Sequence, residues 1–189
     1  LINAKTILEK SKEEVKDLER ENIVTFLNVG RHDEKQKKLS RIVEAAKRLK
    51  EENKNFRVIC IGEGEDTNFY KNIVEKYNLK NEIIFLGKKE NPYPYFNLSD
   101  YIILSSDYEG FPVVYLESFI LNKPIITTKV SDYKQVEGRG ILTEKTVEST
   151  YKAMKEVIEN GYEIKNQFDY NKYNEEISKK IEDIINERE

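Results

Sequence analysis

Glycines and charged residues fall in the short loops that follow apolar runs of the chain. Gly30-Arg31 and then Lys37 follow the first run, and Glu109-Gly110-Phe111-Pro112 lies in the loop after the fourth run. Glycine lets a ligand approach the backbone closely, and fixed positive charge suits an anionic ligand. The fourth loop leads into a predicted helix, whose first N–H groups also favour negative charge. These residue types therefore predict a pocket for a phosphorylated ligand.

Two further loops contain glycine, and each is a weak signal by itself. Gly62-Glu63-Gly64 follows the second run and Gly87-Lys88 follows the third. The G-x-G triplet is only part of the dinucleotide-binding pattern, and the carboxylates beside it would repel a pyrophosphate, so we interpret it as a tight turn. Taken singly, the basic and acidic side chains of the other loops fit a solvated surface. The prediction of a site rests on the convergence of all these loops.

Apolar runs alternate with segments of helical spacing along most of the chain. The runs lack period-2 alternation, which is typical of strands buried on both faces of a sheet. We expect strands at 23–29, 56–61, 83–86, 101–104 and 125–127. The expected helices are at 39–49, 69–77 and 113–120, the last with Pro112 at its first position. After Leu142 the pattern is helical only, with helices at 147–158 and 173–184.

This alternation predicts one α/β domain with a mostly parallel sheet and helices on both faces. In such a sheet every strand-to-helix loop opens at the same edge, and ligands bind there. The predicted domain covers residues 23–189, and residues 1–22 form a charged lead-in segment in which 11–14 fit a capping box. Between the third and fourth runs, the aromatic residues of 93–96 fit a short packed helix better than a stacking surface.

The composition of the chain narrows the class of protein. Its 189 residues carry a net charge of −3, without the basic excess typical of nucleic-acid binders. We expect the one cysteine, Cys60, to be buried, and the one histidine, His32, to lie at the surface or to be partly buried. No apolar stretch approaches the ~20 residues of a transmembrane helix, and no signal peptide is visible. A cytoplasmic protein is therefore expected.

The segment from Glu109 to Glu117 is more specific than the other motifs. Its two glutamates stand eight positions apart, with Gly-Phe-Pro directly after the first, which resembles the E-x7-E signature of retaining GT-B glycosyltransferases. Further matches occur in the family's order at 30–37, 61–64, 85–87, 99–106 and 123–126. The chain is thus similar, over residues 23–175, to the C-terminal donor-binding domain of a family 4 (group 1) glycosyltransferase. The resemblance implies a Rossmann-like half of the GT-B fold.

The resemblance implies roles for the matching residues. Arg31 and Lys37, with Lys38 as an alternative to Lys37, would bind the diphosphate of a nucleotide-sugar and neutralise the charge of the leaving group. Glu109 would accept hydrogen bonds from the donor sugar, and Glu117 from the ribose diol. The other implied donor-binding positions are Gly30, Gly62, Gly87, Lys88, Gly110, Phe111, Pro112 and Val113. Asn122 departs from the family, which usually has glycine before Lys-Pro.

The resemblance also implies the setting in which the domain works. Family members are metal-independent, so no metal or cofactor is expected, and the donor would be a UDP- or GDP-linked sugar. An N-terminal acceptor-binding domain would be missing from this chain, which alone would bind the donor but not transfer the sugar. The parent enzyme would act on a cell-surface glycan, glycolipid or protein. Its location would be the cytoplasm, or the inner face of the membrane if that missing domain associates with lipid.

Other functions fit the same fold. A nucleotide-sugar epimerase or a phosphorylase would share the GT-B architecture, and a degenerate domain would serve only as a scaffold. A receiver-like module fits less well, because it needs an acidic cluster after the first strand, where this chain has Gly30-Arg31.

Overall fold

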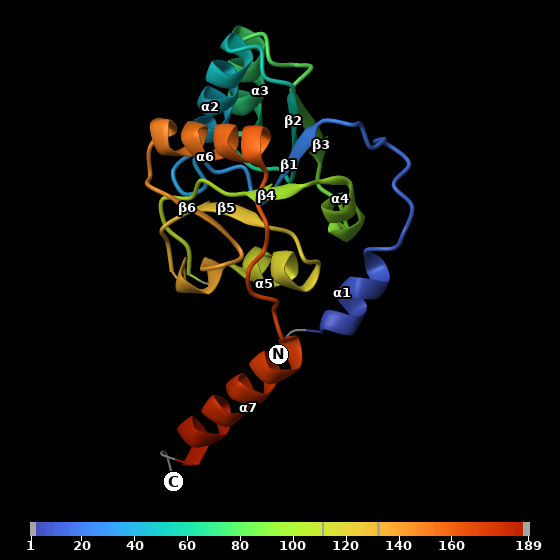
Figure 1. The fold of residues 1–189 in the computed structure, drawn as a ribbon, viewed down its shortest axis with the longest axis vertical. Helices are drawn as coiled ribbons and strands as arrows, with labels where there is room; N and C mark the ends of the chain where they lie inside the picture. The colour runs from blue at the N-terminus through green and yellow to red at the C-terminus, as the bar shows by residue number, and fades with distance from the viewer. Residues whose placement is uncertain (1–2, 111, 132, 187–189) are drawn as a thin grey trace.

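A single parallel sheet forms the centre of the protein (Figure 1). The structure, a computed structural model, describes residues 3–110, 112–131 and 133–186. Within these residues the sheet has six strands, all parallel, in the order β3-β2-β1-β4-β5-β6. The strands are β1 (Val24–Val29), β2 (Phe56–Ile61), β3 (Ile83–Gly87), β4 (Tyr101–Ile103), β5 (Ile125–Thr128) and β6 (Gly140–Thr143). The predicted α/β fold and the five predicted strands are confirmed.

Strand β6 is the one strand of the sheet that the sequence pattern does not predict. It has four residues, opens with Gly140, and lies at the edge of the sheet beside β5. A Cβ atom on Gly140 would lie 1.9 Å from the carbonyl oxygen of Ile125. Glycine is normally depleted in strands, but here its missing side chain permits the close approach that pairs the two strands. The apolar run of β6 is therefore too short to indicate a strand in the sequence, and tertiary packing stabilises this strand.

Helices cover both faces of the sheet, as predicted (Figure 1). Alternate residues of each strand point to opposite faces, so Phe26 packs with one layer of helices and Leu27 with the other. The first layer contains α2 (Leu39–Glu51), α3 (Thr67–Lys76) and α6 (Val147–Asn160). The second layer contains α1 (Ala4–Lys10), α4 (Tyr93–Leu98) and α5 (Val113–Ile120).

Two segments after β5 complete the described chain. The short 3-10 helix η1 (Tyr133–Val136) precedes β6, and α7 (Tyr170–Asn186) follows α6. Phe168 and Tyr173 pack at the edge of the second layer, and the rest of α7 extends away from the sheet (Figure 1). No helix among the described residues is long and apolar enough to cross a membrane.

The N-terminal segment corrects one local prediction. Ser11 does not open a capping box: its backbone N–H donates to Ile7 and Glu9, so it ends α1 instead of starting a helix. The start of α1 is capped by Asn3, whose side chain accepts from the N–H of Thr6 at 3.0 Å. The difference arises because the apolar side of α1 is buried under α4 and α5, and that packing outweighs the local capping pattern.

Two single-residue predictions concern turns and the core. Cys60 is buried within β2, as expected, and burial raises the pKa of its thiol to about 12. Asn122, which replaces the glycine usual in the resembling family, has a φ of 52° in the left-handed region. Asparagine tolerates that region better than most residues, so it fits the turn between α5 and β5.

We predict that Gly62→Ala lowers the free energy of unfolding by about 2–4 kcal/mol, measured by urea denaturation. Gly62 has a φ of 137°, and a Cβ atom there would lie 1.9 Å from the carbonyl oxygen of Gly30. Gly110→Ala is the matched control, because a Cβ atom there would meet nothing within 4 Å. The control should change stability by no more than about 0.5 kcal/mol. Equal losses in both variants would contradict the requirement for this close approach.

Candidate functional site

Three glycines lie at the carboxyl ends of neighbouring strands, and two of them, Gly30 and Gly62, line a pocket. The N–H of Gly30 donates to the Ile61 carbonyl, and the N–H of Gly62 donates to the Gly87 carbonyl, both at 3.0 Å. A pocket of about 370 Å³ lies over Gly30 and Gly62, and Arg31 and Lys88 also line it. The structure therefore brings together the glycine loops that the sequence pattern selects. It also confirms that the G-x-G triplet forms tight backbone packing.

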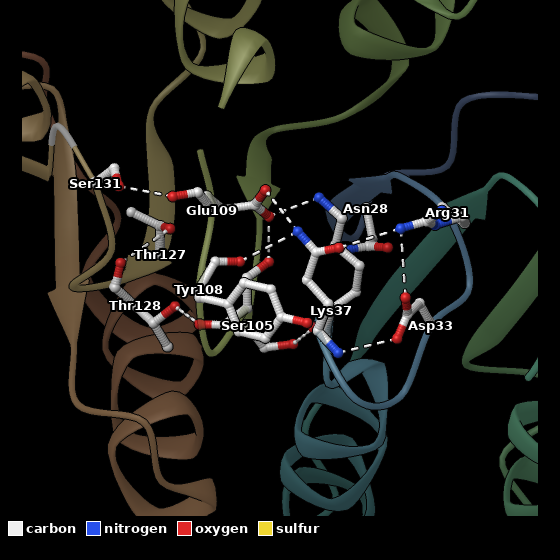
Figure 2. Close-up of polar contacts among 12 residues, drawn as sticks. Asn28, Arg31, Asp33, Lys37, Ser105, Tyr108, Glu109, Thr127, Thr128 and Ser131 are labelled. Atoms are coloured by element: carbon white, nitrogen blue, oxygen red, sulfur yellow. Dashed lines mark hydrogen bonds and ion pairs between the residues drawn. The ribbon is translucent and has the colours of Figure 1, made fainter. Parts of the chain in front are cut away.

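An ion pair between the first and fourth loops lies beside this pocket. The ammonium of Lys37 is 2.6 Å from Oε1 of Glu109, and Figure 2 shows the two side chains facing each other. Ser106 donates to the same oxygen at 2.6 Å, and Gln36 donates to Oε2 at 3.4 Å. The Glu109 side chain is only 8% exposed and that of Lys37 is 26% exposed. A carboxylate so sheltered needs its partners, because an unpaired buried charge is strongly unfavourable.

A second set of contacts holds the two loops against each other. Arg41 on α2 pairs with Asp107 at 2.7 Å and also donates to the carbonyl of Ser105. Asp107 donates its N–H to the Gln36 carbonyl at 2.8 Å. The hydroxyl of Ser105 lies 2.7 Å from the carbonyl of Lys38, a residue whose φ of 50° is left-handed. These contacts fix the unusual turn that aims Lys37 at the site.

The far side of the fourth loop is held by β5 and the segment after it. Ser131 donates its hydroxyl to the carbonyl of Glu109 at 2.6 Å (Figure 2). Thr128 donates to the carbonyl of Ser106. The fourth loop is therefore attached on both sides, to the loop after β1 and to β5 with the segment after it, and the Glu109 side chain is positioned before any ligand binds.

Arg31 stands at the exposed rim of the site. Its guanidinium is 3.4 Å from Oδ2 of Asp33 and donates to Oε1 of Gln36 at 3.2 Å (Figure 2). The side chain is 66% exposed, and Gln36 lies between it and Glu109. Arg31 can therefore contact a ligand from the solvent side of the site, and Lys37 can contact it from the protein side.

The structure distinguishes Lys37 from Lys38, which the sequence leaves as alternatives. Lys38 precedes α2, and its ammonium lies 3.4 Å from Oε1 of Glu34 on the other side of the turn. Of the two lysines, Lys37 is the one that pairs with Glu109. Lys37 is therefore the lysine of the two that belongs to the site.

Glu117 lies on α5 at the end of the eight-residue spacing. Its Oε1 accepts a hydrogen bond from the hydroxyl of Tyr93 at 3.0 Å, and the residue is half-buried. Burial raises the pKa of the Glu117 carboxyl, and the Tyr93 hydrogen bond opposes that rise. Helix α4 thus supplies a hydrogen-bond partner for one of the two glutamates. Sequence reasoning does not select this partner.

The loop between the two glutamates is open to solvent at several positions. Helix α5 begins at Val113, so Pro112 is its N-cap and not its first helical residue. Gly110 is exposed, and the Val113 side chain is 52% exposed at the start of the helix. Phe111, which is predicted to contact the phosphates or the sugar, lies outside the described residues.

His32 is buried, which corrects the prediction of a surface or partly buried residue. Its Nδ1 lies 2.9 Å from the hydroxyl of Thr67 on α3. The rings of Tyr70 and Phe85 meet it edge to face. Burial lowers the pKa of His32, so the neutral imidazole is favoured. The histidine closes the packing between α3 and the first loop.

Several residues of the site escape sequence reasoning. Gln36, Arg41 and Ser131 belong to no motif, yet each holds a predicted residue or its loop in place. Arg41 leaves one usable signal, a charged residue beside the apolar stripe of a predicted helix. Gln36 and Ser131 leave none, because ordinary polar residues in loops are mostly solvated.

A second pocket lies away from these residues. It has a volume of about 640 Å³ and is lined by the amino ends of β1 and β4, with Arg20, Asp100 and Gly161. In parallel α/β sheets ligands bind at the carboxyl ends of the strands, so we assign the site to the smaller pocket and the ion pair beside it.

Comparison with known proteins points to one family. The family model described as "Glycosyl transferases group 1" matches residues 9–188 of the chain. An uncharacterized glycosyltransferase of Methanocaldococcus jannaschii is 35% identical over 103 residues, which are 54% of this chain and 25% of that protein. The matched segments thus cover only about a quarter of the length of the curated relatives.

A second relative and a solved structure are also similar to this chain. An N-acetylgalactosamine-N,N'-diacetylbacillosaminyl-diphospho-undecaprenol 4-alpha-N-acetylgalactosaminyltransferase of Campylobacter jejuni is 29% identical over 103 residues, 54% of this chain and 27% of that protein. The solved structure of HepE of Anabaena in complex with UDP superposes with a TM-score of 0.71 at 16% identity. That superposition covers 86% of this chain and 49% of HepE, and it shows a shared fold.

We predict that Lys37 and Glu109 are energetically coupled in the unliganded protein. A double-mutant cycle of Lys37→Met and Glu109→Gln should give a coupling energy of about 1–3 kcal/mol in urea denaturation, because the pair is largely sheltered from water. The pair Lys80–Glu75 is the matched control, since its side chains are 65% and 64% exposed. That control should show no measurable coupling. A Lys37–Glu109 pair that behaves like the control would contradict the prediction.

Proposed function

The chain belongs to the group 1 glycosyltransferase family, and from this premise we propose that it is the donor-binding domain of a retaining glycosyltransferase. The domain would bind a nucleotide-diphospho-sugar at the carboxyl edge of its sheet. The observation that carries this proposal is the sheltered Lys37–Glu109 pair beside the pocket over Gly30 and Gly62. It places a cation for phosphate and an acceptor for sugar hydroxyls within one small volume.

Lys37 and Arg31 would stabilise the leaving group. During transfer, the bond between the anomeric carbon and the diphosphate oxygen breaks, and the diphosphate leaves with the electron pair. An acceptor hydroxyl bonds to the same carbon, and its proton passes to the departing diphosphate. Negative charge grows on the diphosphate, and two cations held in place beside it lower the energy of the transition state. Binding of the phosphates would take Lys37 from Glu109, whose carboxylate would then accept hydrogen bonds from the sugar.

The remaining positions would bind the rest of the donor. Glu117 would accept hydrogen bonds from the ribose diol, because a carboxylate suits two adjacent hydroxyl donors. The backbone from Gly110 to Val113 would meet the phosphates or the sugar at the start of α5. Gly30, Gly62 and Gly87 would allow the nucleotide close to the backbone, with Lys88 beside the base.

Arg31 and Lys37 also support a metal-independent mechanism without a cofactor. Two fixed cations near the diphosphate can supply the neutralisation that a divalent ion supplies in other transferases. We propose UDP or GDP as the nucleotide of the donor. The UDP in the HepE structure supports the uridine form, because HepE shares the fold of this chain.

The setting of the domain follows from the same proposal. Residues 23–189 would form the donor domain, with 1–22 as the lead-in from an acceptor-binding domain in the parent enzyme. The named activity of the Campylobacter relative, on an undecaprenol-linked glycan, supports a glycolipid among the acceptors proposed, beside glycans and proteins. Such an enzyme would work in the cytoplasm, at the inner face of the membrane where its acceptor domain meets lipid. The donor domain alone would not transfer, because one wall of the cleft would be missing and water would enter.

Titration calorimetry of the chain with UDP, GDP, ADP and CMP tests the proposal, with Mg²⁺ and with a chelator. We expect one nucleoside diphosphate to bind, equally well under both conditions. Binding that requires Mg²⁺ would contradict metal independence. Failure of every nucleotide to bind would favour the non-catalytic scaffold.

The two glutamates should respond differently to substitution. Glu117→Ala should weaken binding of the bare diphosphate by about tenfold, since hydrogen bonds to a charged group are lost. Glu109→Ala should leave that binding unchanged or tighter, because it releases Lys37. It should abolish the gain in affinity that the attached sugar brings. Calorimetry with the nucleotide and the nucleotide-sugar checks both effects, and equal losses on the bare nucleotide would contradict this division of roles.

Arg31→Ala should discriminate between phosphate chains of different length. We expect about a tenfold loss of affinity for the diphosphate and about a twofold loss for the monophosphate, because the guanidinium would contact the outer phosphate. Arg139→Ala is the control, since Arg139 contacts Phe119 and Phe168 instead of the site. The same two titrations check both variants. Equal losses for the two nucleotides in Arg31→Ala would contradict the proposed contact.

A further inference from the structure

The contact between Tyr93 and Glu117 joins α4 to the candidate site. The Tyr93 hydroxyl donates to Oε1 of Glu117 at 3.0 Å, and both residues are half-buried. Among the described residues, Oε2 of Glu117 has no hydrogen-bond partner. An ionised carboxylate has about four lone-pair sites, so one hydrogen bond from Tyr93 leaves most of its capacity for a ligand.

Tyr93 remains a donor throughout the neutral range of pH. Burial and the nearby Glu117 carboxylate raise the pKa of the Tyr93 hydroxyl to about 12. The phenol therefore stays protonated. Its hydrogen bond to Glu117 is stronger when the carboxyl of Glu117 is ionised. A tyrosine in this position thus favours the charged, hydrogen-bond-accepting form of the glutamate.

Helix α4 holds Tyr93 in a defined orientation. The backbone N–H of Tyr93 donates to Oδ1 of Asn91 at 3.2 Å, and the Tyr93 ring packs against Phe96 with centroids 6.2 Å apart. Asn91 in turn donates to the carbonyl of Lys10 at 2.9 Å. The hydroxyl is therefore aimed at Glu117 by contacts that reach back to the N-terminal segment, and not by the ligand.

Few other groups influence the charge of Glu117. Burial raises the pKa of its carboxyl, and the hydrogen bond from Tyr93 is the contact that lowers it. No other described side chain forms a hydrogen bond or an ion pair with it. The other titratable groups on the helices that pack beside α5 are Tyr95 of α4 and Lys5, Glu9 and Lys10 of α1.

From this geometry we infer that Tyr93 is a positioning residue that fixes the Glu117 carboxylate for the ribose of the nucleotide donor. Tyr93 holds one oxygen of the carboxylate in place, and the other oxygen, which has no hydrogen-bond partner among the described residues, would accept from the ribose. The inference rests on the proposed function, because it assigns the ribose to Glu117. It adds a residue from outside the strand-to-helix loops to the determinants of nucleotide recognition.

Tyr93→Phe tests the inference, with Tyr95→Phe as its matched control. Both substitutions remove one phenol oxygen from α4 and keep the ring, but Tyr95 donates to Asp17 at 2.7 Å and not to Glu117. The pKa of Glu117 in the unliganded 189-residue chain can be followed by carbon NMR of its carboxyl, assigned with Glu117→Gln. It should rise in Tyr93→Phe, because the stabilising hydrogen bond is lost. It should stay unchanged in Tyr95→Phe.

Binding of UDP and GDP, each with its 2′-deoxy form, supplies the second measurement. At pH 7.5 we expect Tyr93→Phe to weaken the nucleotide that binds by about tenfold and to reduce its preference over the 2′-deoxy form several-fold. As the pH falls, Tyr93→Phe should lose nucleotide binding at a higher pH than the wild type does. The pH dependence of nucleotide binding by Glu117→Gln serves as the baseline. In that experiment every other titrating group is retained, including the phosphates of the nucleotide.

The outcomes separate this inference from the proposed function. A Glu117 pKa that Tyr93→Phe leaves unchanged, or that Tyr95→Phe raises equally, overturns the role of Tyr93. An unchanged preference for ribose in Tyr93→Phe does the same, when the wild-type chain binds the nucleotide. Failure of the wild-type chain to bind any nucleotide overturns the proposed function and the assignment of the ribose to Glu117.

Discussion

Lys37 and Glu109 must meet although 72 residues separate them, and much of the structure serves this contact. Strands β1 and β4 are neighbours in a parallel sheet, so the loops that follow them open side by side at one edge. A sheltered carboxylate is tolerated there only with a cation and hydrogen-bond donors around it. Arg41 also ties the two loops together, through the carboxylate of Asp107 and the carbonyl of Ser105.

The site has a charged half and a glycine half, and each half follows from a different physical requirement. The charged half lies between β1 and β4, where the side chains form ion pairs and hydrogen bonds with one another. The proposed ligand would compete for these groups. The glycine half spans β1 to β3, where Gly30 and Gly62 allow neighbouring loops to touch through their backbones. A Cβ atom on Gly62 would lie 1.9 Å from the carbonyl oxygen of Gly30, so this backbone contact requires glycine. The proposed donor extends across both halves, from the phosphates to the base.

The N-terminal segment contributes to the site from a distance. Helix α1 packs with α4 and α5 on one face of the sheet, and α4 places Tyr93 against Glu117. Asn97 reinforces this arrangement by donating to the carbonyl of Ser11 at 2.7 Å. The two glutamates of the E-x7-E segment are therefore supported from different sides, Glu109 by loops at the sheet edge and Glu117 by a packed helix.

The class of fold, five of the strands and the positions of the charged and glycine loops can be predicted from the sequence, because periodicity and loop residues are local properties. Tertiary structure decided what depends on distant partners. It paired Lys37 rather than Lys38 with Glu109, buried His32 and added β6 at the edge of the sheet. It also brought Tyr93 to Glu117 across 24 residues. Such contacts arise from the packing of whole elements, and no local pattern in the chain records which side chains will meet.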